Sequence, residues 1–272
     1  MNILGIDIGT TTVTALVLNT AKSEILKSCT LKNDSFIDGR DFEKLQDPDL
    51  IIENCAGGAK RSDWGTLKHF AIQSTSDQEN YVKNPSIISG SVALMPPEKA
   101  GIWCFPYPIE FTKRTQNHLS VSDKKKMADG VQTSFNLVNA FMGAMYLSGR
   151  IDDMDSVNLN ILKEGIKVYK ENRDFISKAF PIYPKGMIKM SNNKEYSFGL
   201  INDQKDEIIL AVWNLSKSER KIEIDLTKYS MKSCKVLLDG VLRGLDGYSF
   251  ENGRLTAYMK KPFSACLFTL NK

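Results

Sequence analysis

The chain has 272 residues, 42% of them hydrophobic and 25% charged, which is typical of a globular protein of one or two domains. Lys and Arg total 36 against 32 Asp and Glu, and the resulting net charge of +4 argues against a polybasic surface for nucleic acid or membranes. No apolar run reaches the roughly 18 residues of a membrane span, and Asp7 interrupts the run that a signal peptide would need.

The cysteines are five in number, widely spaced, and contain no Cys-x-x-Cys pair. With only two histidines in the chain, this pattern predicts no metal site. Reduced thiols are typical of cytoplasmic proteins, so we expect a cytoplasmic location. We also expect no cofactor, no nucleic-acid partner and no membrane partner.

The first stretch, residues 1–41, opens with the string NILGIDIGTTTVTALVLN. Its Val, Ile and Thr residues suit strands, and Gly9 suits a tight turn, so residues 2–19 are predicted to form a β-hairpin. One further strand is expected over residues 25–31.

The second stretch, residues 42–185, has short apolar runs at 50–52, 70–73 and 101–106, which we expect to be strands. Helical stretches lie between and after them, and Ser156 is expected to cap one of these helices. Apolar residues spaced three and four apart are expected on one face of another: Phe135, Val138, Met142, Met145 and Tyr146. Strands that alternate with helices predict (β/α) barrel units, whose chemistry lies at the C-terminal ends of the strands.

The third stretch, residues 186–272, changes to regularly spaced short strands separated by turn residues. Expected strands cover 196–200, 207–214, 220–226, 234–238, 254–259 and 264–270, and residues 222–226 alternate cleanly between apolar and charged. This pattern predicts a small antiparallel β-sandwich. The fold class expected for the chain is therefore α/β: a partial barrel followed by a sandwich.

Asp77 is the first candidate catalytic residue, because it follows a predicted strand and three hydroxyl-bearing residues. A carboxylate at a strand's C-terminal end is a plausible general acid or base. Glu79 is a nearby competitor for this role. The alternative is structural, since most aspartates in such places cap a helix or bind a backbone amide.

The loop after the first of these strands, ENCAGGAKRSD at 53–63, is the first candidate for binding. Its glycines allow a backbone to approach a ligand closely, and Lys60, Arg61 and Asp63 can hydrogen-bond to sugar hydroxyls or a carboxylate. A Gly-rich turn with a solvated Arg–Asp pair explains the same residues. Four aromatic residues are candidates for stacking on a sugar, with burial in the core as the alternative: Trp64, Trp103, Phe105 and Tyr107.

The string from Ile51 to Pro108 resembles the second half of the catalytic barrel of glycoside hydrolase family 36, bacterial α-galactosidases of the raffinose and melibiose type. The family pattern of a Cys, a Gly-Gly turn, an Arg-x-Asp and a Gln-Ser-Thr-Ser-Asp stretch is matched. The matching residues are Cys55, Gly58, Arg61, Asp63, Gln73, Ser76 and Asp77. The string FNLVNAFMGAMYLSGRIDDM resembles the last barrel unit, and the tail resembles the C-terminal sandwich, so the resemblance covers about residues 42–272.

The resemblance implies retaining hydrolysis of terminal α-galactosides such as melibiose and raffinose, with an α-galactoside oligosaccharide as the partner. By position Asp77 would be the acid/base. Cys55, Gly57 or Gly58, and Arg61 would line the sugar subsite, together with our candidates Asp63 and Trp103. Asn80 stands where the family often has a second aspartate, which concerns a sugar contact and not the proton transfer.

The larger departure is the family's nucleophile, which lies in a Lys-x-Asp-x-Asn strand that this sequence does not contain. Residues 42–185 are also too few for a complete barrel of about 250 residues and can hold roughly half of one. A half barrel exposes strand edges and an apolar interior, which favours association into a homo-oligomer. Catalysis by the chain is therefore expected to be impaired.

Residues 1–37 resemble a different family, the opening hairpin of FGGY-type carbohydrate kinases, which have the actin-like ATPase fold. The resemblance implies that Asp7 helps to hold the water shell of a metal–phosphate, and that Gly9, Thr10 and Thr11 offer donors to phosphate. The second phosphate loop and the adenosine-binding glycines of that fold are missing. The Gly-containing string at 239–247 is expected to form hairpin turns.

Three functional hypotheses follow. The chain is an α-galactosidase-family protein whose N-terminal part is replaced by a kinase-like start, a carbohydrate-binding remnant, or a sugar kinase fragment. The first two share the Cys55–Asp77 region and differ in catalysis.

Overall fold

The computed structural model describes residues 2–8, 12–22, 24–32, 51–106, 127–188, 193–238 and 242–272. The chain divides into two compact units, residues 1–50 and 51–272. Each unit is described by itself. In the described part of the chain, no helix has both the length and the apolar character needed to cross a membrane.

The first unit is an antiparallel sheet of β1 (Asn2–Ile8), β2 (Thr12–Asn19) and β3 (Glu24–Lys32), in that order. The predicted hairpin and the further strand are thus confirmed as strands. The Asn19 side-chain oxygen accepts hydrogen bonds from the amides of Ala21 and Lys22, which turns the chain from β2 into β3. Gly9, Thr10, Thr11 and the side chain of Asp7 lie outside the described residues, so the phosphate-binding hypothesis stays a prediction.

The second unit begins with a parallel sheet in which four strands follow one another in chain order. These are β4 (Glu53–Asn54), β5 (Ile72–Ser74), β6 (Ala100–Cys104) and β7 (Ala144–Leu147). The first strand begins later than expected, at Glu53 and not within 50–52. Glu53 and Asn54 pair with Ile72 and Gln73 of β5, whereas Ile51 is exposed to solvent.

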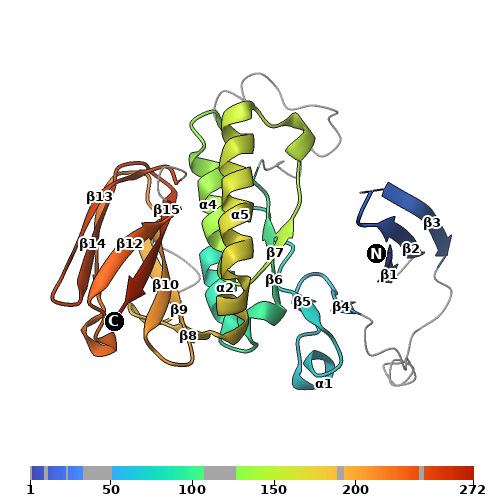
Figure 1. The fold of residues 1–272 in the computed structure, drawn as a ribbon, viewed down its shortest axis with the longest axis horizontal. Coiled ribbons are helices and arrows are strands. Elements are labelled where there is room, and N and C mark those ends of the chain that lie inside the picture. Colours follow the sequence, from blue (N-terminus) through green and yellow to red (C-terminus); the bar gives the residue numbers. More distant parts are fainter. Residues whose placement is uncertain are drawn as a thin grey trace. The chain divides into compact units, whose positions relative to one another are not determined.

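A helix follows each strand: α1 (Trp64–Leu67), α2 (Asn84–Val92), α4 (Val131–Ala140) and α5 (Ser156–Lys178), with short 3-10 turns at Pro97–Lys99 (η2) and Ile151–Asp153 (η4). The helices α2, α4 and α5 cover one face of the parallel sheet (Figure 1). The cap of α5 is Asp155 and not Ser156, because the Asp155 carboxylate accepts a hydrogen bond from the Asn158 amide.

The expected helix through Tyr146 was wrong in its second half. The helix α4 ends at Ala140, and Met145 and Tyr146 lie in β7. Gly143 explains the break, because a Cβ there would lie 2.7 Å from the Ala100 carbonyl oxygen and 2.6 Å from the Ile102 side chain. The chain must pass close to β6 at this point before β7 pairs with it, and the apolar spacing along the sequence does not indicate this close approach.

Two antiparallel sheets follow the parallel sheet and its helices and form two further layers. The five-stranded sheet has the order β12 (Ser233–Leu237), β15 (Ser264–Asn271), β10 (Glu207–Asn214), β9 (Glu195–Ile201) and β8 (Phe180–Ile182). The three-stranded sheet has the order β11 (Arg220–Asp225), β14 (Arg254–Met259) and β13 (Leu245–Glu251), with a 3-10 turn at Thr227–Tyr229 (η5). The predicted strands are present, and β8 and β13 are additional.

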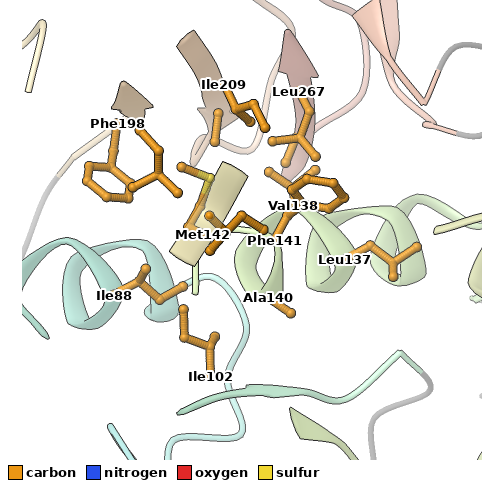
Figure 2. Packing of buried hydrophobic residues seen from close by; sticks show 14 of the residues in the cluster. Ile88, Ile102, Leu137, Val138, Ala140, Phe141, Met142, Phe198, Ile209 and Leu267 are labelled. Atoms are coloured by element: carbon orange, nitrogen blue, oxygen red, sulfur yellow. The ribbon is translucent and has the colours of Figure 1, made fainter. Parts of the chain in front are cut away.

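The five-stranded sheet is buried on both faces. One face packs on the helices, where Met142 and Phe141 at the end of α4 lie close to Ile209 and Leu267 (Figure 2). The opposite face packs on the three-stranded sheet through residues such as Leu210 and Phe268. Strands covered on both sides carry continuous apolar runs, whereas β11, which is covered on one side, alternates. The architecture is therefore mixed α/β, with helices between a parallel sheet and an antiparallel sandwich.

Candidate functional site

The C-terminal ends of β4, β5 and β6 lie side by side at one end of the parallel sheet. In the ladder Asn54 is opposite Gln73, and Ser74 is opposite Gly101, so residues that follow these positions leave the sheet side by side. Cys55 follows β4 and Asp77 follows β5 at this end of the sheet, and both residues are exposed. The predicted binding loop and the predicted acid/base therefore lie at neighbouring strand ends.

Gly58 brings the loop and Asp77 into direct contact. Its φ is +72°, and an added Cβ would lie 2.6 Å from the Cα of Ser76 and 3.0 Å from the backbone nitrogen of Asp77. Gly57 also has a positive φ, of +56°. Only glycine accepts this conformation at this distance without strain, so the Gly-Gly turn rests on the backbone that carries Asp77.

A pair of buried amides holds the two strand ends together. The Asn54 side chain donates to the Gln73 side-chain oxygen over 2.5 Å and to the Arg61 carbonyl over 3.0 Å, and Gln73 donates back to the Asn54 carbonyl over 3.0 Å. These bonds fix the backbone of the loop at Arg61 and leave the Arg61 residue exposed to solvent. Buried amides that satisfy each other in this way rigidify their surroundings.

Asp63 caps the short helix α1. Its Oδ1 accepts a hydrogen bond from the Thr66 amide over 2.9 Å, and the Thr66 hydroxyl accepts one from the Asp63 amide over 3.3 Å. This is the structural role that an aspartate takes at a helix start. A sugar contact by Asp63 stays a prediction.

Asp77 extends from a backbone that is held firmly on its N-terminal side. Thr75 bonds the Gly101 carbonyl twice, through its amide at 3.1 Å and its hydroxyl at 2.8 Å. On the C-terminal side, the Ser76 hydroxyl accepts a hydrogen bond from the Gln78 amide over 3.0 Å. An exposed carboxylate on a fixed backbone can give or take a proton from a bound molecule.

Trp103 lies on the face of the sheet that is turned away from the helices. The indole nitrogen donates to the Ser74 hydroxyl over 3.1 Å, and the ring packs against Phe105 and Tyr146 at centroid distances of 5.9 Å and 5.1 Å. Trp64 is 76% exposed on α1, and Tyr107 lies outside the described residues. The aromatic candidates are thus separated, with Trp103 and Phe105 beside the strand ends.

Tyr146 and Glu53 were not among the predicted site residues. Burial raises the pKa of Tyr146, and the nearby negative charge of Glu53 raises it further, so the two side chains lie close together. Glu53 stands in the string that drew attention to Cys55, but the assignment of Tyr146 to a helix face concealed its position in a strand. Among the described residues, no group of three or more potential metal ligands is present.

No protein-family model matches this sequence, and no curated protein matches it. Solved structures do. The galactosidase domain of the α-galactosidase–sucrose kinase AgaSK aligns with a TM-score of 0.56 at 14% identity over 82% of this chain and 29% of that chain. A variant of the GH36 α-galactosidase AgaA from Geobacillus stearothermophilus, in complex with stachyose, aligns with a TM-score of 0.59 at 15% identity over 85% of this chain and 30% of that chain.

The α-galactosidase from Lactobacillus brevis is similar to the same extent, with a TM-score of 0.55 at 15% identity over 82% of this chain and 29% of that chain. The chain therefore has the fold of a portion of GH36 α-galactosidases. It spans less than a third of the length of each of these enzymes.

Proposed function

We propose that this chain carries the acid/base half of an α-galactosidase site, with Asp77 as the proton donor and acceptor. The observation that carries the proposal is the contact of the Gly58 turn with the Ser76–Asp77 backbone, which places the loop that begins at Cys55 beside the exposed residue Asp77. The likeness in fold to GH36 α-galactosidases supports it. The complexes of such enzymes with raffinose and stachyose support an α-galactoside as ligand.

The parallel strands β4, β5, β6 and β7 would be consecutive strands of a (β/α) barrel, of which residues 42–185 hold about half. Their order along the sheet, which follows the chain, supports this assignment. Residues 186–272 would be the C-terminal sandwich domain. In this arrangement Cys55, Gly57, Gly58, Arg61 and Trp103 would contact the galactosyl ring.

Retaining hydrolysis needs two carboxylates about 5–5.5 Å apart. Asp77 would protonate the glycosidic oxygen as its bond to the anomeric carbon breaks, while the second carboxylate attacks that carbon. Because the sequence contains no Lys-x-Asp-x-Asn string, we propose that the chain lacks the attacking group and that its own hydrolysis of α-galactosides is impaired.

Azide tests both halves of this proposal. With melibiose and the chain alone, we expect glucose release at the buffer background. Added azide can attack the anomeric carbon in place of the missing carboxylate, while Asp77 protonates the leaving oxygen, so that glucose and galactosyl azide form. Asp77→Asn should abolish this azide-dependent release, whereas Asp246→Asn, at an exposed site in β13, should not.

Strong hydrolysis without azide would contradict the impairment, and azide-dependent release that survives Asp77→Asn would contradict the role of Asp77. The alternative function is sugar binding without catalysis. It is favoured by the presence of the loop and Trp103 beside Asp77 in a chain that contains no Lys-x-Asp-x-Asn string. Calorimetry with millimolar melibiose then shows heat while the azide experiment shows no release.

A further inference from the structure

On the face of the parallel sheet opposite the helices, Trp103 of β6 packs against Tyr146 of β7 and bonds to Ser74 of β5. In β6, Ala100, Ile102 and Cys104 are buried in the core under the helices. Side chains alternate along a strand, so Gly101 and Trp103 belong to the other face. Trp103 is opposite Tyr146 in the ladder.

Tyr146 lies flat on the backbone of β6. A Cβ on Gly101 would lie 2.6 Å from Cζ of the Tyr146 ring and 2.9 Å from its hydroxyl oxygen. Glycine at this position is therefore what lets the ring cross β6. The hydroxyl end reaches the neighbourhood of Glu53, on the opposite edge strand of the sheet.

Trp103 is held from three directions. Tyr146 meets it at an interplanar angle of 85° and a centroid distance of 5.1 Å. The Phe105 ring is nearly parallel to the Trp103 ring, at an interplanar angle of 14°. The Ser74 hydroxyl accepts a hydrogen bond from the indole N–H of Trp103. The indole nevertheless stays partly exposed, at the strand ends where Asp77 and the Gly58 turn lie.

We propose that Tyr146 is a positioning residue that fixes the plane of Trp103 as a stacking wall for a galactosyl ring. The apolar C–H face of a hexopyranose suits the electron-rich face of an indole, and the stacking contact depends on the orientation of the ring. This inference rests on the proposed function. It goes beyond the proposed function because it assigns a part in binding the sugar to Tyr146, which lies in β7.

The experiment uses the whole chain labelled with 5-fluorotryptophan and followed by fluorine NMR. The three tryptophans are Trp64, Trp103 and Trp213, and Trp103→Phe identifies the resonance of interest. Tyr146→Ala removes the ring, and Gly101→Ala displaces it. Gly90→Ala in α2 is the matched control, because a Cβ there meets no atom within 4 Å.

We expect the Trp103 resonance to shift in Tyr146→Ala and Gly101→Ala and to stay in place in Gly90→Ala. Melibiose should move the Trp103 resonance of the unaltered chain, with affinity weakened about fivefold in the first two variants. Thermal melts identify any variant that fails to fold, and Tyr146→Phe, which keeps the ring, should retain both the resonance and the affinity.

A Trp103 resonance that is unmoved by Tyr146→Ala and Gly101→Ala overturns the inference. A moved resonance with unchanged melibiose affinity also overturns it. If melibiose leaves the Trp103 resonance of the unaltered chain unmoved while azide-dependent glucose release persists, the inference fails and the proposed function stands. If both are absent, both fail.

Discussion

The indole nitrogen of Trp213 donates a hydrogen bond to the side-chain oxygen of Asn139 over 2.9 Å, and both residues are completely buried. Asn139 lies in α4 and Trp213 in β10, so the bond joins the helical layer to the sandwich. The Asn139 amide also donates to the Tyr81 carbonyl over 3.0 Å, in the segment that follows Asp77. One side chain thus connects three parts of the second unit.

Asn139→Ala should destabilise the chain by about 2–4 kcal/mol, because it leaves the Trp213 N–H and the Tyr81 carbonyl without their buried partner. Urea denaturation measures the loss. Asn172→Ala in α5 is the control, since the Asn172 amide donates to the Val168 carbonyl of its own helix, and its loss should stay below about 1 kcal/mol. Equal losses in the two variants would contradict the bridging role.

Gly58→Ala should damage both stability and sugar binding, because the new Cβ would collide with the Ser76 backbone. Gly186→Ala separates this collision from backbone strain: Gly186 has a similar φ of +76°, and a Cβ there meets no atom within 4 Å. We expect a loss of about 1 kcal/mol for Gly186→Ala from strain alone and about 2 kcal/mol more for Gly58→Ala. Comparable melting temperatures would show that the turn does not rest on Asp77's backbone.

Alkylation by iodoacetamide tests whether Cys55 lines the sugar subsite. Cys29 and Cys55 are exposed, whereas burial raises the pKa of Cys234 to about 12 and keeps Cys104 and Cys266 out of reach. Saturating melibiose should slow the modification of Cys55 about threefold or more and leave Cys29 unchanged, as mass spectrometry of each peptide would show. Maltose is the control sugar. Equal protection by both sugars, or none, would remove Cys55 from the site.

Acid should weaken the stabilisation that Glu195 provides through its ion pairs with Lys185 and Arg220. Burial by itself raises the pKa of Glu195, but hydrogen bonds from Lys185 at 2.6 Å and Arg220 at 2.9 Å outweigh burial and lower it. A carboxylate whose pKa is lower in the folded state than in the unfolded state stabilises the fold at pH values above the unfolded-state pKa of about 4.3. This stabilisation disappears as the pH falls through the folded-state pKa.

The difference in unfolding free energy between the unaltered chain and Glu195→Gln should therefore be about 1 kcal/mol at pH 7 and shrink below pH 4. Urea denaturation across this pH range measures it. Glu171→Gln, at an exposed position in α5, should show a smaller difference with little change over the same range. A difference for Glu195→Gln that grows in acid would contradict the assignment.

Local patterns in the sequence were enough to predict many of the strands and the neighbourhood of Asp77. The runs at 207–214 and 264–270 become β10 and β15 because β-branched and aromatic residues suit a pleated surface. The Gly-Gly turn and the stretch before Asp77 could be recognised because glycine and strand-end carboxylates have local signatures. The sequence alone did not distinguish the capping role of Asp63 from a binding role.

Only the tertiary structure decided where Tyr146, Asn139 and Gly101 belong. Apolar spacing of three and four placed Tyr146 on a helix, because such spacing does not register that Gly143 must pass close to β6. Nothing local marks Asn139 as the partner of Trp213, which is 74 residues away. Local propensity thus determined many of the strands and the place of Asp77 after β5. Contacts between distant segments decided which side chains pack together, because close packing and buried hydrogen bonds depend on partners that no short stretch of sequence contains.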